Sequence, residues 1–119
     1  MILALVTFLP YTKAPMSPAQ RLDLFERTAP NYQKIPGLLR KYYIGEPGKR
    51  AGGAYEFDTL ASAQAHFTTE WVKFMTDTYG SDLRVEYFDA PCVVDNIQNT
   101  IIIEPALRAA AQQNAEARA

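Results

Sequence analysis

Aromatic rings and cations are concentrated in one short stretch of the chain, residues 38–58. Rings supply the walls of a small-molecule pocket, and a cation can hold an anionic substrate or enolate. Strand side chains alternate between two faces, so only one of two neighbouring cations can enter a given cavity. Arg40 shares one face with Tyr42 and Lys41 shares the other with Tyr43, and the sequence leaves open which face lines the cavity. The candidate substrate-binding residues here are Arg40, Lys41, Tyr42, Tyr55 and Phe57.

Acid–base chemistry would depend on His66, the single histidine of the chain. Its unperturbed pKa suits proton transfer near neutral pH. His66 lies beside the predicted apolar stripe of its helix, and Trp71 lies on that stripe, where it offers an indole donor and a flat wall. Tyr43, Tyr55 and Tyr87 could hydrogen-bond a phenol or a carbonyl. Each also has a structural interpretation, because histidine and tryptophan also pack in cores and strand tyrosines fill the interior of a barrel.

Motifs for cofactors are absent from the sequence. It holds no Gly-x-Gly-x-x-Gly helix start, no Walker sequence and no Gly-x-Ser-x-Gly elbow. One histidine and one cysteine cannot form a His/Cys zinc set, so we expect no metal and no cofactor. Cys92 has no partner for an intramolecular disulfide, which fits a reducing cytoplasm. We expect its thiol to be buried and inert.

The composition indicates one small globular domain. The chain has 119 residues, 48% of them hydrophobic and 21% charged, with a net charge of -1. Neither charge sign forms a block, which argues against nucleic-acid binding. The apolar N-terminal segment, residues 1–10, is too short to span a membrane and lacks the basic region of a signal peptide. We therefore expect a buried strand there, and no membrane association.

The first predicted helix has a strong start signal. Ser17 and Gln20 match a capping box, in which each side chain satisfies the other's backbone amide, and Pro18 takes the first helical position. An apolar stripe then recurs at spacings of three and four. Pro30 is expected to kink or divide this helix. The stripe consists of Leu22, Phe25, Ala29 and Tyr32.

The second predicted helix begins near Leu60 and ends before Gly80. Thr68 and Thr69 could interrupt it, because both side chains compete for backbone hydrogen bonds. Its apolar stripe consists of Leu60, Ala63, Phe67, Trp71 and Phe74.

The remaining segments are predicted strands. The first hairpin turns at Pro47-Gly48, a pair suited to the centre of a type II turn. Pro91 interrupts the last strand of the main sheet, and residues 92–94 continue it after a bend or at an edge. Residues 100–103 add a further strand, and Pro105 opens an Ala-rich helix. The strands of the main sheet are expected at residues 2–9, 38–44, 51–58 and 83–88.

This order, strand–helix–strand–strand–helix–strand with a central hairpin, predicts the ferredoxin-like α+β fold with an antiparallel sheet. Helices cover only one face of such a sheet, yet both faces here look apolar. Packing two sheets across a two-fold axis would cover the second face and make an obligate homodimer. The extra C-terminal strand and helix are the kind of element that a subunit lends to a partner, and fraying in solution is the alternative.

Several segments together resemble one known family. They are PGLLRKYYIG, AGGAYEFDTLASAQAHF, TTEWVKFMTDTYG and VEYFDAPCVVDN. These are similar to the YdhR-like monooxygenases of the dimeric α+β barrel superfamily, which are related to the antibiotic-biosynthesis monooxygenases. The resemblance covers residues 1–96, which we take as the barrel domain, with residues 97–119 as a C-terminal tail. It implies a homodimer with a small-molecule cavity between each sheet and its helices.

The resemblance also implies a function. It favours a cofactor-independent monooxygenase for a small aromatic or polyketide-like compound, with His66, Trp71 and Tyr43 as catalytic residues. Phe67 and Tyr87 join the substrate-binding residues named above. A cyclase or isomerase using the same cavity, and a non-catalytic ligand-binding dimer, are the alternatives. Heme degradation would need an axial ligand, which His66 alone could provide.

Overall fold

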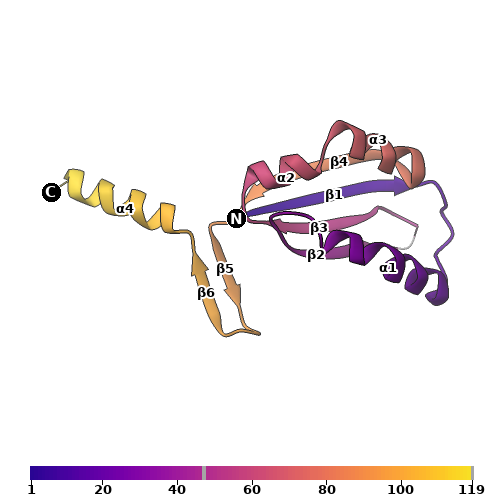
Figure 1. Ribbon diagram of the computed structural model, residues 1–119, viewed down its shortest axis with the longest axis horizontal. Helices are drawn as coiled ribbons and strands as arrows, with labels where there is room; N and C mark the ends of the chain where they lie inside the picture. The colour runs from indigo at the N-terminus through magenta and orange to yellow at the C-terminus, as the bar shows by residue number, and fades with distance from the viewer. Residues whose placement is uncertain (47, 119) are drawn as a thin grey trace.

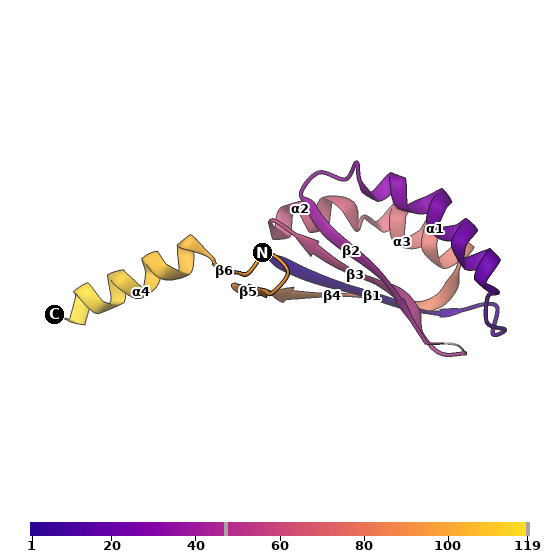
Figure 2. The ribbon, with the colours of Figure 1, turned by 90° about the horizontal axis from the view of Figure 1, so that it is seen from below.

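The computed structural model describes residues 1–46 and 48–118. Four strands form an antiparallel sheet in the order β2-β3-β1-β4. Figure 2 shows α1, α2 and α3 over one face of this sheet. The predicted ferredoxin-like α+β fold is thus confirmed. The elements are β1 Ile2–Pro10, α1 Pro18–Tyr32, β2 Leu38–Gly45, β3 Ala51–Phe57, α2 Leu60–His66, α3 Thr69–Thr78, β4 Gly80–Asp89, β5 Cys92–Asp95, β6 Thr100–Ile103 and α4 Pro105–Arg118.

The start of α1 is the predicted capping box. The Gln20 N–H donates to Ser17 Oγ at 3.2 Å, and the Ser17 N–H donates to Gln20 Oε1 at 2.9 Å. Pro30 was expected to kink or divide the helix, and it lies inside α1 without dividing it. Because the helix ends two residues later, at Tyr32, Pro30 disturbs only its last turn.

The long helical segment after the hairpin is divided, as predicted. α2 ends at His66, and Thr68 caps a new helix by accepting a hydrogen bond from the Trp71 N–H at 3.1 Å. This break changes the direction of the chain between His66 and Trp71. Both residues can therefore face the same space.

The β2–β3 hairpin closes through a tight turn. The Lys49 N–H donates to Glu46 O at 3.0 Å, and Gly48 has a φ of +73°, as a type II turn requires at its second central position. Pro47, the other predicted turn residue, lies outside the described residues.

The core lies between the sheet and α2. Its fully buried side chains come from alternate positions of β1 and β3, which all point to the helices. Phe57 lies between the sheet and Phe67 of the α2 terminus, with ring centroids 5.7 Å apart. The cluster consists of Ala4, Val6, Tyr55, Phe57, Ala63 and Phe67.

On the opposite face of the sheet, which we name the open face, none of the described helices forms a covering layer (Figure 2). Apolar side chains nonetheless stand on it. Tyr42, Phe88 and Leu3 are 58%, 48% and 41% exposed, whereas Tyr55 and Phe57 on the helix face are 2% and 0% exposed.

Residues 92–118, which we name the C-terminal arm, project from the sheet (Figure 1). β5 and β6 pair only with each other, so the expectation that residues 92–94 continue β4 was wrong. The arm gives the molecule its 62 Å length, against 32 and 26 Å in the other directions. Cys92 is exposed here, which corrects the expected buried thiol. This small sheet spans the predicted domain boundary after residue 96, and that division stays a prediction.

We predict that Phe57→Ala lowers the free energy of unfolding by about 3–5 kcal/mol, because it leaves a cavity at a fully buried site. Phe74→Ala is the matched control, since Phe74 is 57% exposed, and should cost less than about 1 kcal/mol. Urea denaturation followed by circular dichroism measures both. Equal losses in the two variants would contradict this placement of the core.

Candidate functional site

A cleft of about 1840 Å³ opens between α1, α3 and the helix face of the sheet. Strand alternation decides which hairpin residues reach it. Lys41 and Tyr43 pair with Tyr55 and Gly53 on the helix face and line the cleft. The chemically active residues around it are Tyr32, Lys41, Tyr43, Tyr55, His66 and Trp71.

Arg40 and Tyr42 lie on the open face, away from the cleft. The Arg40 guanidinium binds Asp95 of the C-terminal arm, with Nη2 3.0 Å from Oδ2, and lies 3.9 Å from Glu56 Oε2. Asp95 is buried, and hydrogen bonds from the Gln98 amide and from Arg40 hold its pKa below the usual range. Of the two faces that the sequence left open, the Lys41 face is therefore the one toward the helices.

The amine of Lys41 is enclosed by tyrosine rings. Its Nζ lies 3.2 Å from the ring centroid of Tyr32, 3.8 Å from that of Tyr43 and 5.1 Å from that of Tyr55. None of the ion pairs among the described residues includes Lys41. The amine therefore has ring faces as neighbours in place of a carboxylate. We name this arrangement the tyrosine cage.

Withdrawal from water controls the charge of Lys41. Burial lowers its pKa from the ordinary 10.5 to about 7. The ring faces attract the ammonium form by up to ~2 kcal/mol, which opposes the effect of burial without cancelling it. Both the ammonium and the free amine are therefore populated near neutral pH.

One cage tyrosine is held by a hydrogen bond, and burial keeps the other two protonated. Thr28 Oγ1 and the Tyr43 hydroxyl lie 2.8 Å apart, and the rings of Tyr32 and Tyr55 are neighbours, with centroids 6.0 Å apart. Burial raises the pKa of both Tyr32 and Tyr55 above the ordinary value of 10.0. These hydroxyls thus act as neutral donors and acceptors over the physiological range.

Tyr32 is a site residue that sequence reasoning missed. Its position on the apolar stripe of α1 indicated core packing only. The available signal was that this stripe must lie against the hairpin that carries Lys41, since α1 leads directly into β2.

His66 lies beside the cage among aromatic rings. Its ring centroid is 6.0 Å from Tyr55, 5.2 Å from Trp71 and 4.8 Å from Phe67. Within the part of the chain that the structure describes, its buried Nε2 has no hydrogen-bond partner. Burial, and secondarily the charge of Lys41, lower the pKa of His66 below 6.5. A neutral imidazole can accept a proton from a bound molecule.

The other predicted site residues divide between the core and the edge of the site. Trp71 is half-buried and lines the cleft. Phe57 and Phe67 are buried and pack beneath α2, so they support the site without lining the cleft. Tyr87 on β4 faces the helices 6.1 Å from Phe67 but is also outside the cleft lining.

Gly53 leaves room for the amine. A Cβ at this position would lie 2.7 Å from the Tyr55 ring and 3.2 Å from Lys41 Cε. Any side chain here would press on the cage, so the Lys41 stem can cross β3 only over a glycine.

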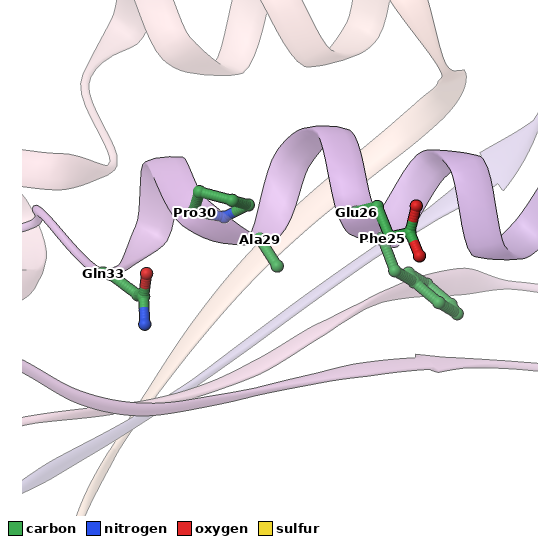
Figure 3. A pocket seen from close by; sticks show the side chains of 5 residues that line it. All are labelled: Phe25, Glu26, Ala29, Pro30 and Gln33. Carbon is green, nitrogen blue, oxygen red and sulfur yellow. The ribbon is translucent and has the colours of Figure 1, made fainter.

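A second, smaller hollow of about 500 Å³ follows α1 (Figure 3). Figure 3 shows the side chains of Phe25, Ala29 and Gln33 on the side of α1 that faces the strands. Pro30 and Glu26 complete its lining, and Glu26 is its one titratable residue. This hollow offers no second group for chemistry.

Residues 1–46 and 48–118 provide neither a metal site nor a membrane-spanning helix. No group of three or more His, Cys, Asp or Glu side chains could hold a metal ion there. No helix in that part of the chain is long and apolar enough to cross a membrane.

Comparison with known proteins yields a distant likeness. No family model and no curated protein matches the chain. Among solved structures it is similar to an ethyl tert-butyl ether degradation (EthD) family protein from Bacillus halodurans, at 21% sequence identity and a TM-score of 0.43. The match covers 76% of this chain and 99% of that chain. Values this low transfer no function, and the YdhR-like resemblance remains an interpretation of the sequence segments.

We predict that Lys41→Met changes the pH dependence of stability. The pKa of Lys41 is lower in the folded chain than in the unfolded chain, so between pH 7 and pH 9 the unfolded chain binds more protons than the folded chain. The free energy of unfolding of the wild type therefore rises with pH in this range. Lys41→Met removes this rise, so its stability relative to wild type should be higher at pH 6 than at pH 9, by about 1–2 kcal/mol after allowance for partial exposure. Urea denaturation at both pH values measures it.

The matched control is Lys73→Met. Lys73 is exposed and paired with Asp77, which raises its pKa, so both forms of the chain keep it charged from pH 6 to pH 9. Its stability difference from wild type should stay constant. The same pH dependence in both variants would mean that Lys41 titrates as an ordinary lysine.

Proposed function

We propose that the protein is a cofactor-independent monooxygenase for a small aromatic or polyketide-like compound bound in the cleft. The observation that supports this most directly is the grouping of a neutral His66 with the Lys41 amine and Trp71 around an aromatic-walled space. Tyr43, held by Thr28, adds a fixed hydroxyl to the same wall. A base, a cation and water-excluding walls are what such a reaction asks of a protein.

In the proposed reaction His66 takes a proton from a phenol or enol. The Lys41 ammonium then holds the resulting anion, and this electron-rich anion passes an electron to dioxygen. Oxidation of a CH₂ group to a carbonyl consumes one O₂ and releases one water, so no external reductant is required. The rings of the cleft keep water away from the anion and strengthen its attraction to Lys41.

Two alternatives use the same cleft. A cyclase or isomerase would need the same proton transfers without oxygen. A ligand-binding protein without turnover is favoured by one observation: no acid among the described residues hydrogen-bonds His66. A general base usually has such an orienting partner.

We further propose that the working unit is a homodimer joined through the open face. Exposed apolar side chains on that face would pack against a second sheet. The charged residues that stand between them are Arg40, Glu56, Arg84 and Glu86. The C-terminal arm supports this proposal, since it carries exposed Ile97, Ile101 and Ile102 beyond the body of its own chain. A partner subunit would cover these side chains.

We predict oxygen uptake and quinone formation when the protein meets a suitable polyphenol or anthrone-type compound. His66→Ala should lower the rate about 100-fold or more, because it removes the base. Trp71→Phe keeps an aromatic wall and should lower it less. An oxygen electrode measures the consumption of oxygen, and absorbance spectra measure the quinone.

His66→Ala must be compared with Gln64→Ala, an exposed position on the same helix, at equal stability. Turnover that continues without oxygen would favour the cyclase or isomerase. A native ligand released unchanged, with no turnover of any compound, would favour the binding protein.

We predict that the wild-type chain is a dimer at micromolar concentration. Leu3→Lys places a charge on the open face, on a strand with a neighbour at each side, and should give a folded monomer. Leu22→Lys, at an exposed position of α1, should leave the dimer intact. Light scattering measures the mass of each, and a stable wild-type monomer would contradict the proposal.

A further inference from the structure

We propose that Lys41 is also a nucleophile, which condenses through its amine with the carbonyl group of an aldehyde or ketone bound in the cleft. This inference rests on the proposed function only in that the cleft must admit a small aromatic molecule. It assigns a covalent chemistry to a group that the oxygenase proposal uses only as a charge.

The geometry presents the amine to the cleft and to nothing else that could bind it. Lys41 lines the cleft, and its Nζ rests against the rings of Tyr32 and Tyr43. Two exposed lysines instead hold acids: Lys49 lies 3.2 Å from Glu46 Oε2, and Lys73 is paired with Asp77. The amine of Lys41 is thus withdrawn from water and lies against rings at the wall of the cleft.

The groups that face the amine allow it to lose its proton. The amine meets the rings of Tyr32 on α1, Tyr43 on its own strand and Tyr55 on β3. On α2, His66 is close enough for the charge of Lys41 to lower its pKa. None of these four carries a negative charge at neutral pH. Burial lowers the pKa of Lys41 to about 7, and although the ring faces oppose this effect, the free amine is far more populated at pH 7 than in an exposed lysine. For an ordinary lysine the free fraction is roughly one in 2,500.

The reaction balances without an oxidant or reductant. The amine nitrogen attacks the carbonyl carbon, and the C–O π bond opens to a carbinolamine. A proton moves from nitrogen to oxygen, for which neutral His66 can serve as the carrier. Loss of the oxygen as water leaves a C=N bond to Lys41. The products are one imine and one water.

The walls of the cleft indicate the class of carbonyl compound. Tyr43, Tyr55 and Trp71 offer ring faces in the cleft, whereas its arginines, Arg21 and Arg27, lie on α1 and are not part of the cage. A flat aromatic aldehyde or ketone therefore suits the space beside the amine. The hydroxyls of Tyr32 and Tyr55 could hydrogen-bond a phenolic substituent. p-Hydroxybenzaldehyde is therefore a suitable probe.

The test traps the imine without oxygen. Wild-type protein, Lys41→Arg and Lys73→Arg are incubated with p-hydroxybenzaldehyde and sodium cyanoborohydride at pH 7, and peptide mass spectrometry locates the reduced adduct. We expect Lys41 to react about tenfold or more faster than Lys73. Lys73→Arg should keep this labelling, and Lys41→Arg should lose it. The Lys41 rate should rise from pH 5 to pH 7 and then level off.

Labelling spread evenly over the lysines, or absent from Lys41, would overturn the proposal. The wild-type peptide map decides this even if Lys41→Arg fails to fold. Quenching of the single tryptophan, Trp71, reports binding separately. Quenching without an adduct would reject the imine while leaving a ligand-binding cleft. An adduct at Lys41 without any oxygen uptake in the aerobic assay would support the imine and count against the oxygenase.

Discussion

The contact between α2 and β3 holds the rest of the domain in place. Ala63 is fully buried, and so small a side chain lets α2 come close to the sheet. Phe67 then lies edge-on against Tyr55, with centroids 5.0 Å apart. The residue just before it, His66, is consequently turned toward the rings of the hairpin. A helix that packed further from the sheet would leave this imidazole in water.

Strand alternation places two neighbouring cations in opposite surroundings. Arg40 meets carboxylates and solvent, where a permanently charged guanidinium is stable. Lys41, one residue later, meets rings, where an amine can give up its charge. An arginine in place of Lys41 could not become neutral, and it would need an acid that the tyrosine cage lacks.

Most of the fold could be predicted from the sequence because its signals are local. The capping box of Ser17 and Gln20, the break at Thr68 and the period of the strands depend on residues close together in the chain. The face of Lys41 could not be predicted, since alternation is symmetrical until the helices take one side. Nor could the pairing of β5 with β6, because an apolar run of four residues does not show which strand it will join. Tyr32 was missed for a similar reason: helical spacing shows its stripe but not the residue opposite.

The missing side chain at Gly53 has a consequence for how this cleft can change over generations. Every glycine codon is a single base change from an alanine codon, and alanine here would meet the Tyr55 ring and the Lys41 stem. A single point mutation can therefore lift the amine out of its cage while every residue that carries chemistry stays the same. A comparison of related chains that considered only lysine, histidine and tyrosine would overlook the loss of this amine site. The residue at position 53 must therefore be compared together with them.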